Sequence, residues 1–451
     1  MFNKVLVANR GEIAVRVIRA CKELGIKTVA VYSEADEHCL HALLADEKVC
    51  LPGFKPADTY LNMPAIIKAA REKGAGAVHP GYGYLAENES FAAACREAGI
   101  VFIGPDPETI RLAGNKLQAK ETAARAGVPV IPGSNRGLTT LAEALEVAGE
   151  TGYPVILKAS AGGGGRGMRI CGDETELREE FPIAKAEAGS AFGDPTLYVE
   201  KYLQNPRHIE IQVLGDRSGK IIHLGERECS VQRRYQKLLE ESPSPALDDS
   251  LRDKMGRAAV QVARSINYFN AGTVEFMLDG NKNFYFMEIN ARLQVEHPVT
   301  EMVTGIDIVK EQIRLSLGEG LDYDYYSLSP RGWAVECRIN AEDPDKFFLP
   351  SPGTIEIYRP PGGFGVRLDT HVYQGYSVPP YYDSLLAKLV AHGPDRKTAL
   401  SIALRALDEF TVEPVKTTIP LHKKILADDS FAGGDFDTGF VRKFLPEEDE
   451  D

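Results

Sequence analysis

The sequence lacks any long apolar run and any surplus of positive charge. No segment approaches the ~18 to 20 consecutive apolar residues of a membrane span, and the opening Met-Phe-Asn-Lys-Val leads into a strand pattern without a signal peptide. The 52 Lys and Arg residues face 65 Asp and Glu residues, which gives a formal charge of -13. We therefore expect a cytoplasmic protein whose main partner is neither nucleic acid nor a membrane.

Two common site signatures are also missing. The seven cysteines form no Cys-x-x-Cys pair, which is typical of reduced, packed thiols and argues against a disulfide or zinc framework. No GxxxxGK[ST] segment occurs, so a Walker P-loop is excluded. What remains is an average soluble composition, 43% hydrophobic and 26% charged, over 451 residues. That length corresponds to about two to four globular domains.

The order of apolar segments predicts a change of architecture near residue 115. Strand-like runs at 4–8, 27–33, 75–81 and 100–105 alternate with helical segments, which predicts a parallel α/β sheet covered by helices over residues 1–115. The following region contains strand candidates joined by tight turns, which is typical of an antiparallel α+β domain. A third section begins after Pro330 with the strand-like WAVECRIN and ends with a helix near 396–410.

The glycine run Gly162–Gly165, followed by Arg166 and Gly167, is a candidate phosphate-binding loop. Glycines allow the backbone to approach a phosphate closely. Because the run lies between two strand candidates, a lid over phosphates fits better than a Walker cradle, and a flexible linker is the alternative. Lys158, just before the run, could place a cation beside the same phosphates, and Lys116 could supply a second.

Two glutamates on a predicted hairpin form a candidate metal site. If residues 280–283 form the loop, Asp279 pairs with Phe284 and Glu275 lies opposite Glu288. Asn290 follows two residues later on the same face. These hard oxygen ligands suit Mg²⁺ or Mn²⁺, whereas a solvent-facing polar side of the hairpin is the alternative.

Further polar residues follow this hairpin. Arg292, Gln294 and Glu296 share one face if the chain stays extended, and they offer an anion clamp and a base. Upstream, the segment 227–237 gathers basic residues in an acidic chain, for which a solvated basic face is the alternative reading. Arg338 follows WAVEC outside these motifs, which suggests a separate step of the reaction.

Six segments together resemble the biotin carboxylase subunit of biotin-dependent carboxylases, of the acetyl-CoA carboxylase or pyruvate carboxylase type, in the ATP-grasp superfamily. They are ANRGEIA, HPGYGYLAEN, KASAGGGGRGM, EKYLQNPRHIEIQV, FMEINARLQVEHPVTE and ECRINAEDP. The resemblance covers about residues 2–445. It implies an N-terminal Rossmann-like domain (1–115), an ATP-grasp domain (116–330) with a mobile lid at about 131–203, a C-terminal biotin carboxylase domain (331–446) and an acidic tail (447–451).

The resemblance also implies that MgATP and bicarbonate give carboxyphosphate, whose carboxyl group passes to the ureido N1′ of biotin. It assigns ATP contacts to Lys116, Lys158, Gly163, Gly164, Gly165, Glu200, Lys201, Leu203, His208, Gln232, Glu275 and Glu288. It assigns two Mg²⁺ or Mn²⁺ ions to Glu275, Glu288 and Asn290, and bicarbonate to Lys237, Arg292, Gln294, Val295 and Glu296. Glu296 would be the general base, Tyr82 and Arg338 would face biotin, and the catalytic group would be Glu296, Arg338, Arg292 and Lys237.

Three positions depart from the family pattern. Tyr235 stands where the best-known bacterial form has histidine, Ala291 replaces a threonine within NTRIQVEHP, and Asn115 replaces an acidic residue before Lys116. The first concerns a nucleotide contact, and the other two are tolerated changes around the site.

The resemblance further implies partner proteins. No Met-Lys-Met biotinylation segment occurs, so biotin is expected on a separate biotin carboxyl carrier protein, together with a carboxyltransferase subunit. Arg19, Glu23, Phe364 and Arg367 match the family's dimer interface, so a homodimer is expected. The final acceptor, whether acetyl-CoA, propionyl-CoA, pyruvate or 2-oxoglutarate, belongs to the carboxyltransferase and is left open.

Two other functions compete with this interpretation. One is another ATP-grasp ligase, such as a carbamoyl-phosphate synthetase half, which would not require biotin. The other is a degenerate nucleotide-binding regulatory module. The presence of both lysines, all three metal ligands and Glu296 argues against degeneracy.

Overall fold

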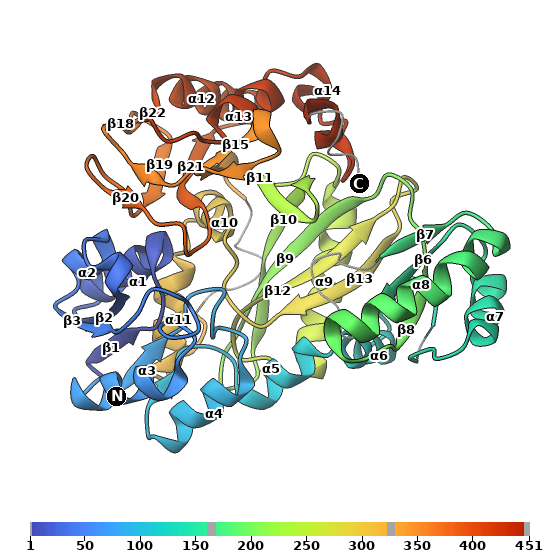
Figure 1. Ribbon diagram of the computed structural model, residues 1–451, viewed down its shortest axis with the longest axis horizontal. Coiled ribbons are helices and arrows are strands. Elements are labelled where there is room, and N and C mark those ends of the chain that lie inside the picture. Colours follow the sequence, from blue (N-terminus) through green and yellow to red (C-terminus); the bar gives the residue numbers. More distant parts are fainter. Residues whose placement is uncertain (1, 135, 160–167, 323–329, 446–451) are drawn as a thin grey trace.

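The computed structural model describes residues 2–134, 136–159, 168–322 and 330–445. Figure 1 shows the N-terminal part in blue beside a central sheet in green and yellow, with the C-terminal part in orange and red above it. The mixed α/β and α+β class predicted from the sequence is confirmed. Within the described ranges, no helix is both long and apolar enough to cross a membrane.

The N-terminal part is a parallel sheet covered by helices, as predicted. Its strand order is β3-β2-β1-β4-β5, with β1 Lys4–Val7, β2 Lys27–Ser33, β3 Glu47–Leu51, β4 Ala77–His79 and β5 Val101–Phe102. The helices are α1 Gly11–Glu23, α2 Leu40–Leu44, α3 Met63–Glu72, α4 Glu89–Glu97 and α5 Pro107–Gly114. The sequence did not predict strand β3. It is an edge strand whose residues are alternately exposed and partly buried, so its sequence contains no continuous apolar run.

The middle part begins with α6 (Lys116–Arg125) and then forms a small sheet of order β7-β6-β8. Its elements are α7 Leu141–Thr151, β6 Val155–Ala159, β7 Arg169–Cys171, α8 Glu174–Phe192 and β8 Leu197–Lys201. Their apolar side chains form a separate core drawn from residues 138–199. The predicted glycine run joins β6 to β7 in the sequence and lies outside the described residues.

An eight-stranded sheet forms the centre of the molecule. Its strand order is β13-β12-β9-β10-β11-β14-β21-β19. Its strands are β9 Arg207–Gly215, β10 Ile221–Arg233, β11 Gln236–Ser242, β12 Asn270–Leu278, β13 Phe284–Asn290, β14 Trp333–Asn340, β19 Val366–Thr370 and β21 Leu385–Gly393. All their pairings are antiparallel. Because β11 pairs with β14, one sheet continues across the predicted boundary at residue 330.

The remaining elements cover this sheet or extend the C-terminal part. The helices are α9 Asp249–Ser265, α10 His297–Thr304, α11 Ile308–Ser316, α12 Arg396–Glu409, α13 Ile419–Leu426 and α14 Asp429–Gly433. The short strands are β15 Glu342–Asp343, β16 Leu349–Pro350, β17 Gly353–Thr354, β18 Ile357–Arg359, β20 Ser377–Val378 and β22 Thr411–Glu413, and η4 is Phe440–Phe444. One core joins β1 and α1 to β9, β10 and α11, so the N-terminal part packs directly on the central sheet.

The two faces of β9 explain how the central sheet positions polar groups. Ile209, Ile211 and Val213 pack in the core that contains α9, while His208, Glu210 and Gln212 alternate with them on the opposite face. All six side chains are buried. A buried strand with one charged face requires partner charges on neighbouring strands, because an unpaired buried charge is costly.

Candidate active site

A cavity of about 1050 Å³ brings together most of the residues that the sequence singled out. The lining includes Tyr82, Lys116, Lys158, Glu200, Lys201, Leu203, His208, Gln232, Lys237, Glu275, Glu288, Asn290, Arg292, Gln294, Val295 and Arg338. Glu296 has no exposed surface and lies behind the lining, in contact with it through Lys237 and Arg338. The glycines Gly163, Gly164 and Gly165 fall outside the described residues.

The hairpin β12–β13 places Glu275 directly opposite Glu288, as predicted. The predicted pairing of Asp279 with Phe284 is wrong, because Leu278 pairs with Phe284. A bulge between Glu275 and Phe276 shifts the register by one residue and restores the glutamate pair. Asn290 lies beside them, since its amide nitrogen donates to Glu275 Oε1 at 2.8 Å.

These three residues suit a hard divalent cation. Two carboxylates and an amide supply the oxygen ligands that Mg²⁺ and Mn²⁺ prefer. Two ammonium groups neutralise the carboxylates here: Lys116 Nζ is 3.1 Å from Glu288 Oε2 and Lys237 Nζ is 3.1 Å from Glu275 Oε1. The like charges therefore face each other across the ladder with cations beside them, which meets the requirement for such a pair.

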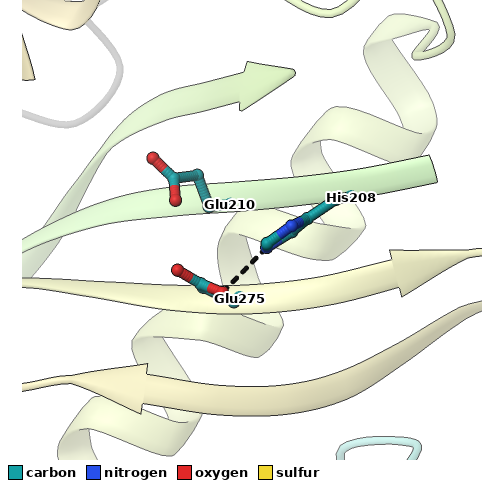
Figure 2. A group of neighbouring side chains, drawn as sticks. All are labelled: His208, Glu210 and Glu275. Atoms are coloured by element: carbon teal, nitrogen blue, oxygen red, sulfur yellow. Dashed lines mark hydrogen bonds and ion pairs between the residues drawn. The ribbon is translucent and has the colours of Figure 1, made fainter. Parts of the chain in front are cut away.

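A second group of potential ligands, His208, Glu210 and Glu275, lies next to this pair (Figure 2). Figure 2 shows the hydrogen bond between His208 on β9 and Glu275 on β12 as a dashed line. His208 Nε2 lies 2.8 Å from Glu275 Oε2. Lys237 Nζ contacts both glutamates, at 2.6 Å from Glu210 and 3.1 Å from Glu275. An ammonium group thus already balances this cluster. Although burial alone lowers the pKa of His208, Glu275 raises it above its usual value.

Glu296 is held between two cations at the inner wall of the cavity. Lys237 Nζ is 2.5 Å from Glu296 Oε1, and Arg338 Nη2 is 2.9 Å from Glu296 Oε2. Burial alone would raise the pKa of Glu296, but Lys237, Arg338 and Arg227 hold it well below its usual range. Glu296 is therefore ionised at neutral pH, the state that a general base requires.

Arg338 is not separate from the other motifs. Although Arg338 lies outside those motifs in the sequence, its Nη2 contacts Glu296 in the structure. Its assignment to a separate step of the reaction stays a prediction. The arginine reaches the site because β14 belongs to the same sheet as β11.

The segment after β13 brings Arg292, Gln294 and Glu296 into the site, although the premise of an extended chain is wrong. Strand β13 ends at Asn290, and Glu296 is already the N-cap of α10. Arg292 Nη1 donates to Gln294 Oε1 at 2.8 Å, and Gln294 Nε2 donates to Glu275 Oε1 at 3.0 Å. The three side chains therefore converge through turns instead of through strand alternation.

The two predicted phosphate-binding lysines have different partners. Lys158 Nζ donates to Glu200 Oε2 at 2.6 Å, and Lys120 Nζ donates to Glu200 Oε1 at 2.9 Å, whereas Lys116 contacts Glu288. Lys201 donates to the backbone carbonyls of residues 152 and 153. All four lysines line the same cavity, together with their partners Glu200 and Glu288.

Tyr82 lies in a buried polar chain. Its hydroxyl donates to Glu12, and Lys388 Nζ lies 3.1 Å from Glu12 and donates to the Val295 carbonyl at 2.8 Å. Burial raises the pKa of Tyr82 well above its usual value, and Glu12 raises it further. Tyr82 is therefore a neutral hydrogen-bonding group at the cavity wall.

The three departures from the family pattern have clear positions. Tyr235 lines the cavity with a backbone φ of 64° and 56% exposure. Asn115 caps α6 by accepting from the backbone of Gln118 at 3.0 Å. Ala291 is buried, and its backbone nitrogen donates to Glu87 at 3.1 Å.

Sequence reasoning missed several charged residues of the site, among them Glu210, Lys120 and Glu240. Glu210 accepts from Lys237 and from the fully buried Arg227. Glu240 accepts from Arg338 Nε at 2.6 Å. A usable signal was present, because charges alternate with apolar residues in HIEIQV and VECRI, and such alternation in a buried strand indicates a polar inner face.

Three family models match successive parts of the chain between residues 1 and 443. The family described as biotin carboxylase, N-terminal domain, matches residues 1–110. The family described as carbamoyl-phosphate synthase L chain, ATP binding domain, matches residues 115–324. The biotin carboxylase C-terminal domain matches residues 336–443. Biotin carboxylase domains match on both sides of the ATP-binding domain, so the alternative of a carbamoyl-phosphate synthetase half is excluded.

Relatives match over nearly full length. A biotin carboxylase of a Nostoc species is 55% identical and covers 98% of this chain and 99% of its own. One of the pyruvate carboxylase subunits of Methanothermobacter thermautotrophicus is 52% identical over 98% of this chain and 90% of its own. The biotin carboxylase domain of Hydrogenobacter thermophilus 2-oxoglutarate carboxylase, a dimer solved with MgADP, ADP and bicarbonate, has a TM-score of 0.94 at 54% identity and 98% coverage of both chains. With matching motifs, fold and relatives, the chain belongs to the biotin carboxylase family of ATP-grasp ligases, which carboxylate biotin with ATP and bicarbonate.

Proposed function

We propose that this cavity activates bicarbonate with MgATP and carboxylates biotin carried by another protein. The observation that carries the proposal is the juxtaposition, at one cavity, of a hard-ligand pair, four lysines and an ionised Glu296 held by Lys237 and Arg338. Phosphoryl transfer needs positioned cations and electrostatic stabilisation. A base beside them supplies the deprotonated nucleophile.

In this proposal the nucleotide occupies the part of the cavity lined by Lys116 and Lys158. Its contacts are Lys116, Lys158, Gly163, Gly164, Gly165, Glu200, Lys201, Leu203, His208, Gln232, Glu275 and Glu288. Glu275, Glu288 and Asn290 would hold two Mg²⁺ or Mn²⁺ ions. When bound, such ions neutralise phosphate charge during transfer.

Bicarbonate is proposed to bind between Lys237, Arg292, Gln294 and Val295. Glu296 takes the bicarbonate proton, and the resulting oxyanion attacks the γ-phosphorus of ATP, so that ADP leaves and carboxyphosphate forms. Carboxyphosphate then breaks down to CO2 and phosphate, and the phosphate takes the N1′ proton of biotin. Arg338 stabilises the charge that develops on the ureido oxygen while N1′ attacks CO2, and Tyr82 borders the biotin.

We further propose two partners in the cytoplasm, a biotin carboxyl carrier protein and a carboxyltransferase. A homodimer is supported by Phe364, an apolar side chain that is 99% exposed, and Arg367 would join the same interface. Arg19 and Glu23 would extend this interface. The relatives serve different holoenzymes at similar identity, so the final acceptor is left open.

The first prediction concerns substrate dependence. ATP hydrolysis should require bicarbonate and rise with free biotin, because Lys237 and Arg292 provide an anion site beside the proposed phosphate position. Phosphate release is measured in degassed buffer with and without each substrate. Equal rates of phosphate release with and without bicarbonate would contradict the carboxylase assignment. A rate that does not change when biotin is added would contradict the proposed acceptor.

The second prediction concerns the domains. We propose the divisions 1–115, 116–330 and 331–446 with a tail at 447–451, and a lid at about 131–203 that moves as one body because it has its own apolar core. Amide exchange of β6 and β8 should slow when MgATP is bound, while exchange in β1 and β2 stays unchanged. Equal exchange in both states would show that this region does not close over nucleotide.

A further inference from the structure

Arg338 is held on one side by two different carboxylates. Its Nε donates to Glu240 Oε1 at 2.6 Å, and its Nη2 also contacts Glu240. The same Nη2 lies 2.9 Å from Glu296 Oε2. Its Nη1 has no hydrogen-bond partner among the described residues, and Arg338 lines the cavity. The Nη1 nitrogen, with its two N–H groups, is thus available to a ligand.

Glu240 belongs to a buried carboxyl pair. It lies on β11 directly opposite Glu336 on β14, and both side chains have no exposed surface. In the part of the chain that the structure describes, Glu240 Oε2 and both carboxyl oxygens of Glu336 lack hydrogen-bond partners. Two adjacent buried carboxyl groups cannot both ionise readily.

The single negative charge of this pair resides on Glu240. Burial raises the pKa of Glu336 well above its usual value. Burial also raises the pKa of Glu240, to about 7, against the opposing effect of Arg338. The charged groups facing Glu240 are Arg338, Glu296 and Lys237, and the carboxyl group of Glu336 lies opposite it on β14. Glu336 therefore keeps its proton, and Glu240 ionises near neutral pH and binds Arg338.

We propose that Glu240 is a positioning residue that keeps Arg338 aimed at biotin while Glu296 changes protonation state. This inference rests on the proposed function. When Glu296 accepts the bicarbonate proton it loses its charge, and its hold on Nη2 weakens. Glu240 still holds Nε and Nη2, so the guanidinium keeps its place and Nη1 can donate to the ureido oxygen. Glu240 thus connects bicarbonate activation to the biotin step without touching either substrate.

The experiment compares Glu240→Gln with Glu336→Gln and measures phosphate release and carboxybiotin in one assay with free biotin. Glu240→Gln should lower carboxybiotin formed per phosphate by about 10- to 100-fold, the effect of losing a charged hydrogen bond. Glu336→Gln replaces one neutral, unbonded group by another of the same shape at the neighbouring position, so the ratio should stay at the parental value. Glu240→Asp should recover part of the ratio.

The pH dependence of carboxybiotin formed per phosphate distinguishes the proposal from a purely structural role of Glu240. A purely structural role would not produce such a dependence near the pKa of Glu240. In the parental protein, carboxybiotin per phosphate should fall below about pH 7, because Glu240 becomes protonated and releases Arg338. Glu336→Gln should keep this fall. The proposal would be overturned if Glu240→Gln lowered phosphate and carboxybiotin in proportion, or if both variants lowered carboxybiotin per phosphate equally. A parental ratio that did not change with pH would also overturn it. Absence of carboxybiotin in the parental protein would instead overturn the proposed function.

Discussion

Glu296→Gln should lower the bicarbonate-dependent ATPase by about 10²- to 10⁴-fold, the usual contribution of a general base. The amide keeps the shape of the side chain but cannot accept the bicarbonate proton. The fold should persist, because Lys237 keeps Glu210 and Glu275 as partners and Arg338 keeps Glu240. Steady-state phosphate release and thermal melting of both proteins test this directly.

The binding of MgATP provides the control for Glu296→Gln. Glu296 has no exposed surface and lies behind the lining, so the dissociation constant for MgATP should change little. A variant that melts normally and retains the parental rate would show that another group removes the proton. Because the pKa of Glu296 is well below its usual range, a fall in carboxybiotin formed per phosphate near neutral pH belongs to another group, and Glu240 is the candidate.

The sequence predicted the β12–β13 hairpin and the pairing of Glu275 with Glu288, because strands joined by a short turn pair locally. The loop expected from the sequence is one residue too short, and the bulge between Glu275 and Phe276 offsets that error, so that Glu275 and Glu288 still lie opposite each other. The bulge beside Glu275 could not be predicted, because it depends on how β12 pairs with β9 as well as β13. The glutamate pair was correct although the pairing nearest the turn was not.

The buried charge network was harder to predict because it depends on non-local strand order. Arg338 meets Glu240 and Glu296 only since β14 pairs with β11, an arrangement that residue spacing does not reveal. Charged residues such as Glu210 and Glu240 also resemble surface residues in composition. Their alternation with apolar neighbours was the signal, but it becomes interpretable only when both faces of the strand are known to be buried.

Glu288→Gln should lower ATP turnover by about 10²- to 10³-fold at ordinary Mg²⁺ concentration, since metal charge stabilisation contributes several kcal/mol. An amide at this position retains its shape but loses the charge on which a hard cation depends. Glu288 is partly exposed to the cavity and its partner Lys116 is 41% exposed, so the change leaves no deeply buried unpaired charge. The melting temperature should therefore stay close to that of the parental protein.

A Mg²⁺ titration of turnover separates metal binding from general damage to the site. The Glu288→Gln curve should move to higher Mg²⁺, because a weaker ligand set needs more free cation for the same occupancy. Asp279→Asn is the matched control: it removes one negative charge from the same hairpin at its turn, where Asp279 accepts from the backbone of Asn281 and Asn283. Asp279 lies four residues along the chain from Glu275, about 13 Å away. The Mg²⁺ titration of the Asp279→Asn variant should therefore follow the parental curve. Parental turnover in Glu288→Gln across the whole titration would exclude the pair formed by Glu275 and Glu288 as the metal site, and equal losses in the two variants would assign the effect to hairpin charge in general.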